Sequence, residues 1–408
     1  MNKNIISELN ISKKKLKMLY VNLGGVGVYC SDKTIGRCLG WVIEKSEVFL
    51  LIPQLIKDAT RSEMSSISTN SKKVKIITLP FSSKMRSSGF GIIFSYFIRV
   101  LFSPILLFKN IPKFDVCYAN SALLVDVIPI LFLKLFGKCR HFILMIDSIV
   151  PKPSQRSGNI FINTITHLES KFVVKIISRF TSIIFTVNPE LKKEIVKQGI
   201  DEKKIFLTQN GLFMDKINKV LARKEKIYDG VYMGRITENK GIFDLLSVWS
   251  GIIKIIPNAK LAVMGTGRED VVKKFLNKIK DGNLEENIDY FGYVSGNKKY
   301  EIFRSSKIFI FLSKVNADES WGISLMEALA CGLPAITYDL AIYNHIYRED
   351  ILQKNKIGDI NSVINKIKFL LIDEDIRRQL RNKSIIFAEQ FNWFDIAKRD
   401  LEIIYNTI

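Results

Sequence analysis

The clearest pattern in the chain is a series of short apolar runs separated by segments with helical spacing. The runs are rich in β-branched and aromatic residues, which is typical of strands buried on both faces, as in parallel sheets. Helical spacing between them is clearest at residues 243–256 and 271–280. The first set of predicted strands is 18–23, 48–53, 74–80, 116–119, 141–147 and 182–187, and the second is 230–236, 261–265, 288–294, 308–313 and 334–339.

Two successive sets of alternating strands and helices predict an α/β protein with two doubly wound, Rossmann-like domains. We place the N-terminal domain at residues 1–200, the C-terminal domain at 201–385 and a closing helical segment at 386–408. Ligands of such sheets bind beyond the carboxyl ends of the strands. The loops that follow the strands are therefore where we expect the chemistry.

Two of these loops contain closely spaced glycines. Gly24 and Gly25 follow the first strand, and Gly265 and Gly267 follow the strand at 261–265. Glycine lets backbone amides approach an anion without a Cβ in the way. The third glycine of the dinucleotide fingerprint is missing from both loops, so a nicotinamide cofactor is not expected, and a plain tight turn explains the first loop equally well.

A third loop, GRITENKG at 234–241, follows the first strand of the second domain. Arg235 lies at the strand end and Lys240 at the mouth of the next helix. Two cations beside the free N–H groups of a helix N-terminus suit a diphosphate. A surface loop with ordinary basic residues is the alternative.

The fourth loop gives the strongest signal. In ESWGISLMEALACGLP, Gly322 lies at the start of a helix predicted over 323–330, with Glu319 before the helix and Glu327 inside it. An anion at this helix N-terminus would have one carboxylate on each side, and both carboxylates are suited to accept hydrogen bonds from sugar hydroxyls.

These motifs resemble those of the retaining GT-B glycosyltransferases of family 4, which transfer sugars from nucleotide sugars. The resemblance covers residues 200–408 nearly completely and the earlier residues in patches. It rests on the glycine pair at 24 and 25, NG at 210–211, GRITENKG at 234–241, PNAKLAVMGTG at 257–267, FGYV at 291–294, the two-glutamate motif at 319–340 and the tail at 391–408.

The resemblance implies a GT-B architecture, with two Rossmann-like domains facing across a cleft and a C-terminal helix that crosses back to the first domain. It also implies roles: Arg235 and Lys240 would hold the donor diphosphate, Glu319 the hydroxyls of the transferred sugar, and Glu327 the ribose. Further donor contacts would come from Gly24, Gly25, Gly265, Gly267, Val294, Gly322 and Ile323.

One position departs from the family. Its members often carry a histidine beside the reacting sugar at the end of the strand that matches HFILMID, but here Ile146 precedes Asp147. Asp147 is therefore a candidate for contacting the acceptor or relaying its proton. A helix N-cap before Ser148 is the alternative.

We expect neither a metal nor another cofactor. Fixed cations and a helix dipole suffice to stabilise a diphosphate leaving group. The D-x-D motif at Asp373 and Asp375 opens an arginine-rich helix, which favours helix-start acids. The three histidines, His141, His167 and His345, lack metal-ligand spacing, so we interpret them as structural. Five cysteines without a C-x-x-C pair fit a reducing cytoplasm.

Charge adds a question about partners. The chain carries a net charge of +21, and residues 1–200 hold 29 basic and 12 acidic side chains. Such asymmetry fits nucleic acid, an anionic membrane or acidic substrates. Nucleic-acid binding needs aromatic stacking platforms or a recognition element among the basic residues, and the sequence shows neither. A solvated basic surface is the plain alternative.

The apolar stretch Gly89–Phe108 bears on the same question. Its length just allows a spanning helix, but Arg99 near its middle and Pro104 count against one. An interfacial helix and a buried helix of the N-terminal domain both fit. No signal peptide is recognisable at the N-terminus, because no continuous apolar region precedes a small-residue cleavage site.

The sequence therefore predicts a cytoplasmic glycosyltransferase, peripheral on the inner face of the cell membrane. It would use a nucleotide-sugar donor and a membrane-associated saccharide or lipid-linked acceptor in cell-surface polysaccharide or glycolipid synthesis. An anionic membrane surface would contact its N-terminal domain. One alternative is a soluble acceptor, either a sugar phosphate or a glucan. The other is a non-catalytic protein that binds nucleotides or nucleic acid.

Overall fold

The computed structural model describes residues 15–24, 30–79, 89–150, 152–153, 160–221, 226–316 and 319–408. The chain divides into two compact units, which are described separately below. Unit 1 comprises Met1–Thr186, Ile195–Phe206 and Phe394–Ile408, and unit 2 comprises Val187–Glu194 and Leu207–Trp393. The domain boundaries after residues 200 and 385 stay predictions.

Unit 1 is built on a seven-stranded sheet with the strand order β3-β2-β1-β4-β5-β6-β7. Among the strands β1 to β6, neighbours pair in parallel. The central strands are buried on both faces, as their continuous apolar runs predict. The strands are β1 Lys17–Val21, β2 Glu47–Pro53, β3 Lys75–Leu79, β4 Phe114–Ala119, β5 Cys139–Ile146, β6 Ile183–Thr186 and β7 Ile205–Leu207.

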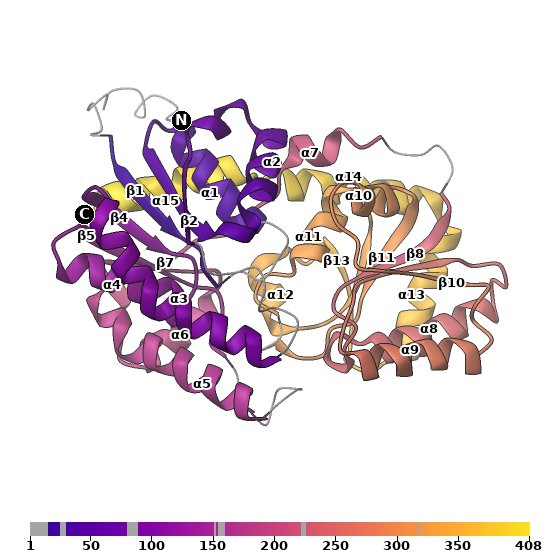
Figure 1. Cartoon of the computed structure of the whole chain (residues 1–408). Coiled ribbons are helices and arrows are strands. Elements are labelled where there is room, and N and C mark those ends of the chain that lie inside the picture. Colours follow the sequence, from indigo (N-terminus) through magenta and orange to yellow (C-terminus); the bar gives the residue numbers. More distant parts are fainter. Residues whose placement is uncertain are drawn as a thin grey trace, which may run out of the picture. The chain divides into compact units, whose positions relative to one another are not determined.

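Helices cover both faces of this sheet. Figure 1 shows α1, α2 and α15 on one side of the strands and α3, α4 and α5 on the other. Their bounds are α1 Asp32–Ile43, α2 Lys57–Ile67, α3 Gly89–Asn110, α4 Leu124–Leu135, α5 Ile160–Lys175 and α15 Trp393–Thr407. The residues of α6, Pro189–Lys197, are divided between the two units.

The C-terminal helix packs closely on α1. The buried guanidinium of Arg37 forms an ion pair with Asp400 at 2.8 Å, and the Trp41 indole donates a hydrogen bond to the Ala397 carbonyl at 3.1 Å. A Cβ at Gly40 would lie 2.4 Å from the Cβ of Ala397, so the two helices meet where α1 has no side chain. The helix expected to return to the first domain therefore lies against it.

Unit 2 contains a six-stranded parallel sheet with the order β10-β9-β8-β11-β12-β13. The chain starts in the middle at β8 and adds strands outward to β10. It then returns to β11 beside β8 and adds strands in the opposite direction, so the strand order reverses between β8 and β11, which we call the reversal point. The strands are β8 Tyr228–Met233, β9 Leu261–Met264, β10 Ile288–Gly292, β11 Ser306–Phe311, β12 Ala335–Tyr338 and β13 Leu352–Asn355.

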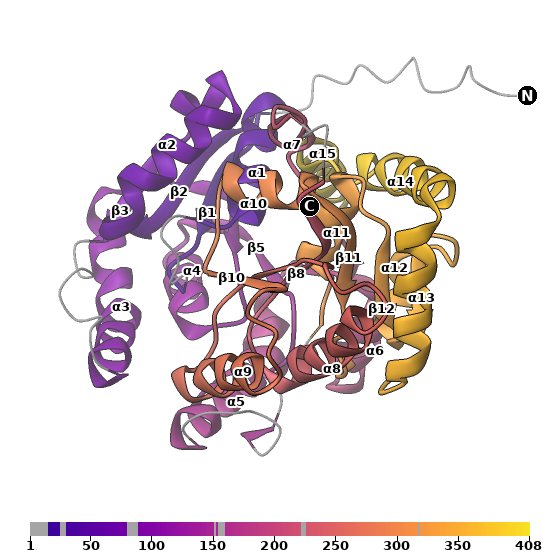
Figure 2. The same cartoon turned by 90° about the vertical axis from the view of Figure 1, so that its right-hand side faces the viewer.

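The sheet of unit 2 also lies between helices. Figure 2 shows α8 and α9 on one side of the strands and α10 and α11 on the other. The helices are α7 Met214–Asn218, α8 Ile242–Ile253, α9 Glu269–Asp281, α10 Asn297–Arg304, α11 Ile323–Ala330, α12 Ala341–Ile346, α13 Ile360–Ile372 and α14 Glu374–Glu389. Two parallel-sheet, Rossmann-like units confirm the predicted fold class.

The long apolar stretch forms one helix, α3. Within the ranges described above, no helix combines the length and apolar character that crossing a membrane requires. Arg99 is buried inside unit 1, and its guanidinium donates to the carbonyl of Leu23. The charge that counted against a spanning helix therefore has a partner inside the protein.

Candidate functional site

The predicted cation Lys240 and the predicted carboxylate Glu319 form an ion pair in unit 2. Lys240 ends the short helix η6 (Glu238–Lys240) after β8, and Glu319 lies between β11 and α11. The Lys240 Nζ donates to Glu319 Oε1, and the two side chains are only 8% and 5% exposed. Because β8 and β11 are neighbours at the reversal point, two residues 79 positions apart meet where sheets of this type bind ligands.

Backbone packing fixes the position of Lys240. The next residue, Gly241, has φ +70°, and a Cβ there would lie 2.0 Å from the Leu312 carbonyl oxygen. The amide of Lys314 donates to the Asn239 carbonyl at 2.8 Å. Only glycine permits this approach, so the loop after β8 lies directly against the end of β11.

Arg235, the second predicted cation, has a different environment. Its side chain is exposed, while its carbonyl accepts a hydrogen bond from the hydroxyl of Tyr232 at 2.8 Å. The structure therefore fixes the backbone of Arg235 and leaves its guanidinium at the surface, in contrast to buried Lys240.

Glu327, predicted to hold a ribose, lies inside α11 and is also paired. Lys299 of α10 donates to its Oε1, and the hydroxyl of Tyr300 donates to the same oxygen at 3.1 Å. Glu327 is buried, and the side chain of Lys299 is 14% exposed. The sequence reasoning missed Lys299 and Tyr300, because two adjacent residues on an ordinary helix carry no motif.

The start of α11 has the predicted geometry. Gly322 is the N-cap with φ +72°, and the helix runs from Ile323 to Ala330 as expected. The hydroxyl of Tyr347 donates to the Trp321 carbonyl at 3.0 Å and so holds the turn before the helix. The first amides of α11 lack partners within the helix, which makes its N-terminus suited to an anion.

The glycines after β9 permit close backbone contact. A Cβ at Gly265 would lie 1.8 Å from the Gly234 carbonyl oxygen, and one at Gly267 would lie 2.1 Å from the Ile236 carbonyl oxygen. The amide of Gly265 also donates to the Gly292 carbonyl at 2.7 Å. The loops after β8, β9 and β10 are thus joined through their backbones, and Val294 lies half-buried just beyond them. Proximity of these residues to a base stays a prediction.

In unit 1, Gly24 is held by a buried carboxylate. Asp126 of α4 accepts hydrogen bonds from the amides of Leu23 at 2.6 Å and Gly24 at 3.1 Å, and from the Ser121 hydroxyl at 2.6 Å. Burial raises the pKa of Asp126 to about 6. The Gly24 amide is therefore already used within the protein, and Gly25, the other predicted contact of this loop, lies outside the described residues.

Asp147, the acceptor candidate, pairs with a lysine of α1. Its Oδ2 accepts from Lys33 Nζ, which also donates to the Asn120 carbonyl at 3.1 Å. Its Oδ1 is buried and has no hydrogen-bond partner within the described residues. Residues 148–150 are not helical, so the alternative of an N-cap before Ser148 is wrong. The acceptor role stays a prediction.

The part of the chain that holds the paired lysines and glutamates is similar to a known protein family. Residues 213–386 match the model of the family described as "Glycosyl transferases group 1". This segment contains both lysine–glutamate pairs, Lys240–Glu319 and Lys299–Glu327. Most of unit 2 is therefore similar to a group 1 glycosyltransferase domain.

Curated relatives resemble part of the chain. A phosphatidyl-myo-inositol mannosyltransferase of Mycobacterium leprae is 24% identical over 204 residues, which are 49% of this chain and 52% of that protein. The N-acetyl-alpha-D-glucosaminyl L-malate synthase of Bacillus anthracis is 25% identical over 227 residues, which are 52% of this chain and 56% of that protein. The chain thus spans about half the length of these relatives.

The fold likeness extends over nearly the whole chain. The Anabaena protein HepE, solved in complex with UDP and glucose, has a TM-score of 0.69 at 15% identity, with 96% of this chain and 100% of that chain covered. At this identity the likeness shows the fold alone. It supports the GT-B architecture for the chain, of which residues 213–386 match the family model.

A metal centre would need several histidine, cysteine or acidic side chains close together. No group of three or more His, Cys, Asp or Glu side chains that could hold a metal ion occurs in the described part of the chain. Asp373 of the D-x-D motif caps α14, since its carboxylate accepts from the Ile376 amide at 2.9 Å. The structural interpretation of that motif is confirmed, and the absence of a metal stays a prediction.

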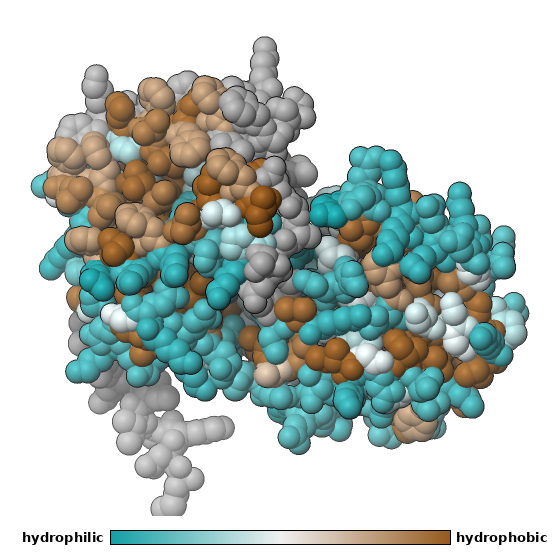
Figure 3. Space-filling model, turned by 90° about the horizontal axis from the view of Figure 1, so that it is seen from below, coloured by the Kyte–Doolittle hydropathy of each residue, from teal (hydrophilic) through white to brown (hydrophobic). Residues whose placement is uncertain are grey.

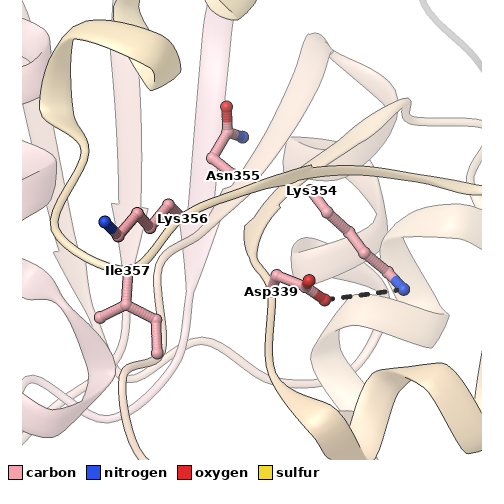
Figure 4. A pocket seen from close by; sticks show the side chains of 5 residues that line it. All are labelled: Asp339, Lys354, Asn355, Lys356 and Ile357. Atoms are coloured by element: carbon pink, nitrogen blue, oxygen red, sulfur yellow. Dashed lines mark ion pairs between the residues drawn. The ribbon is translucent and has the colours of Figure 1, made fainter.

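A shallow cavity of about 470 Å³ lies elsewhere on unit 2, at the ends of β12 and β13. Figure 4 shows Asp339 and Lys354 turned toward each other, at 3.8 Å, while Lys356 and Ile357 point away from them. The predicted site residues do not line this cavity. The paired residues after β8 and β11 remain the better candidate site.

Proposed function

We propose that the chain is a retaining family 4 glycosyltransferase that moves a sugar from a nucleotide-diphosphate sugar to a membrane-associated saccharide or lipid-linked acceptor. The observation that carries the proposal is the buried Lys240–Glu319 pair beside the N-terminus of α11. A buried cation, a buried carboxylate and a helix N-terminus at the reversal point of a parallel sheet suit a ligand that is both anionic and rich in hydroxyls.

Each charged group has a task in this reaction. Departure of the nucleotide leaves negative charge on the diphosphate, which Lys240, Arg235 and the α11 dipole would stabilise. Glu319 would then bind hydroxyls of the sugar, and Glu327 those of the ribose. These roles need no metal, so we propose that transfer proceeds in the presence of chelator.

The acceptor is proposed to be at the cytoplasmic face of a membrane. Support comes from the mannosyltransferase relative, whose name contains the lipid phosphatidyl-myo-inositol. The basic charge of residues 1–200 supports the same location. A soluble acceptor is the second candidate, supported by the relative that is named an L-malate synthase.

A donor screen followed by a transfer assay tests the proposal. We expect one or a few nucleotide sugars to raise the melting temperature of the purified chain, and the same donors to be hydrolysed slowly or transferred. Glu319→Gln keeps the shape of the side chain and removes its charge, so it should abolish transfer while the fold is retained. A protein that neither gains stability from any nucleotide sugar nor turns one over would refute the proposal.

A further inference from the structure

The outer surface of unit 1 carries a broad apolar area on three neighbouring helices. Figure 3 views the molecule from the side on which α3 and α5 lie in Figure 1, and it shows a large hydrophobic area on this unit. Leu101, Leu135 and Phe161 are 65%, 75% and 67% exposed. We call this area the α3–α5 face, and its large exposed side chains are Phe94, Phe97, Leu101, Phe102, Ile105, Leu135, Phe136, Ile160, Phe161, Leu168, Phe172 and Ile176.

The helix α3 has two distinct sides. Its exposed apolar residues are spaced by three, four, one and three positions and so share one side of the helix. Arg99, Ser103 and Leu107, spaced by four, are buried on the other side. Among the described side chains of α3, five large apolar ones are thus left at the surface, more than packing against unit 1 requires.

The helix α5 repeats this arrangement and adds charge. Phe161, Leu168 and Phe172 lie on one exposed side, and Lys171 and Lys175 are exposed beside them. The only acidic residues in α3, α4 and α5 are Asp126 and Glu169, and both are buried. The α3–α5 face is therefore apolar with a positive border, and its three helices supply no exposed carboxylate.

A polar cluster joins the three helices into one body. Glu169 of α5 accepts from the Tyr96 hydroxyl of α3 and from the Leu124 amide at the start of α4, the latter at 2.7 Å. The Tyr96 oxygen in turn accepts from the Val125 amide at 3.3 Å. The apolar side chains of the three helices therefore belong to one fixed surface.

We propose that the α3–α5 face docks on the surface of a lipid bilayer that contains anionic lipids. Apolar and aromatic side chains would enter the boundary between headgroups and acyl chains, and the lysines at the border would contact anionic headgroups. Long lysine side chains suit this position, because their stems lie along apolar surface while the ammonium reaches the headgroups.

Charge favours a membrane over a second copy of the chain. In a symmetric dimer the same surface meets itself, so the border lysines of one copy would lie near those of the other without an exposed carboxylate from these helices to pair with. Anionic lipids supply the missing negative charge. An acidic, apolar protein partner would supply it too, and the test below separates these cases.

The docking face also lies close to the glycine loop of unit 1. The exposed side of α3 belongs to the same helix whose Arg99 holds the Leu23 carbonyl, and α4 supplies Asp126 to the amides of Leu23 and Gly24. Docking would therefore place Leu23 and Gly24 on the far side of α3 from the bilayer, one helix diameter (~10 Å) away. This step rests on the proposed function, in which the acceptor is membrane-associated, whereas lipid binding itself does not.

Vesicle flotation tests the proposal with the full chain. We expect the protein to float with vesicles of phosphatidylcholine that contain phosphatidylglycerol, and to bind pure phosphatidylcholine about tenfold more weakly. Phe97→Ser with Leu101→Ser should weaken binding at least about tenfold, because two apolar side chains no longer enter the boundary. Lys171→Glu with Lys175→Glu should abolish the preference for phosphatidylglycerol.

A matched variant controls for general loss of surface apolarity. Ile372 and Ile386, exposed by 67% and 61% on α13 and α14, lie in unit 2, and Ile372→Ser with Ile386→Ser should leave flotation unchanged. Equal loss in both double variants, or no binding to any vesicle, would overturn the proposal. So would a dimer in light scattering that is lost in the Phe97/Leu101 variant, which would assign the face to a second copy.

Failure of docking and failure of the proposed function are distinguishable. Stabilisation by a nucleotide sugar, followed as melting temperature without lipid, should be the same in the Phe97/Leu101 variant as in the parent chain. If a nucleotide sugar stabilises the protein but the protein does not float with vesicles, the docking proposal is wrong and the proposed glycosyltransferase function stands. If the protein floats with vesicles but no nucleotide sugar stabilises it, the docking proposal stands and the proposed use of a nucleotide-sugar donor is wrong.

Discussion

The two units use their buried charges in different ways. In unit 2 the buried carboxylates Glu319 and Glu327 accept hydrogen bonds from Lys240 and Lys299. Unit 1 also has a buried ion pair, between Arg37 and Asp400 on packed helices, but its buried carboxylates Asp126 and Glu169 accept from backbone amides, and buried Arg99 donates to a backbone carbonyl.

This difference separates charges that can exchange partners from charges that fix the chain. In a pair of an ammonium and a carboxylate, each group can exchange its partner for a ligand group. The ammonium can bind a phosphate, and the carboxylate can accept hydrogen bonds from a hydroxyl. A carboxylate that holds two backbone amides cannot leave without freeing the loop. We therefore expect substitutions in unit 2 to act on donor chemistry, and those in unit 1 to act on loop position.

The largest effect is expected at the Lys240–Glu319 pair. Lys240→Met or Glu319→Gln alone should lower the transfer rate by at least about 100-fold, because the diphosphate or the sugar loses its charged partner. Each single substitution also leaves the other buried charge unpaired, at a cost of about 3–5 kcal/mol in the free energy of unfolding. Transfer assays and urea unfolding measure the two effects.

The double variant Lys240→Met with Glu319→Gln separates stability from chemistry. It should regain most of the stability, since no unpaired charge remains, and it should stay inactive. Recovery of transfer together with stability would show that the pair is structural and that the donor binds elsewhere.

The second pair should affect donor binding more than turnover. Lys299→Met should raise the donor KM about tenfold and change kcat little, because Glu327 is proposed to hold the ribose, away from the bond that breaks. Tyr300→Phe removes one neutral hydrogen bond and should cost about 1 kcal/mol of stability. An equal fall of kcat in both variants would contradict the ribose role.

The Arg99 contact tests the role of unit 1. Arg99→Met keeps most of the length and frees the Leu23 carbonyl, so we expect kcat/KM for transfer to fall about tenfold through loss of loop position. Stabilisation by the donor nucleotide, which depends on unit 2, should be unchanged. Ser103→Ala is the matched control, because its hydroxyl is buried on the same side of α3 without a hydrogen-bond partner in the described structure.

The site residues of unit 2 were easier to predict from the sequence than those of unit 1. Lys240, Glu319 and Gly322 were predictable because strand ends, glycines and a helix start mark them locally. Asp126 and Arg99 were not, because they act on a loop that is about 100 and 76 positions away in the sequence, through hydrogen bonds that no local motif marks. The sequence interpretation treated Arg99 as an obstacle to membrane crossing, whereas its role depends on the loop that lies beside α3 in the fold.

Strand prediction failed for physical reasons at two places. The strand β7 has three residues, Ile205–Leu207, too few to show a pattern. The strand β13 reads Leu-Gln-Lys-Asn and lies at the edge of its sheet, where polar side chains are tolerated. Both lie at sheet edges, so the two-unit fold was predictable without them.

The smallest effect on transfer is expected from Asp126→Asn, which keeps the acceptor oxygen for the two amides. Burial raises the pKa of Asp126 from 3.8 to about 6, so its contribution to stability is fully present below about pH 4 and is lost as the pH rises through 6. The loss amounts to about 3 kcal/mol at most. The substituted amide does not titrate, so the difference in unfolding free energy between variant and parent should grow in the variant's favour from about pH 4 to pH 7, as measured by urea unfolding. A constant difference across this range would show that Asp126 stays charged throughout, and that its bonds to Leu23 and Gly24 outweigh the cost of burial.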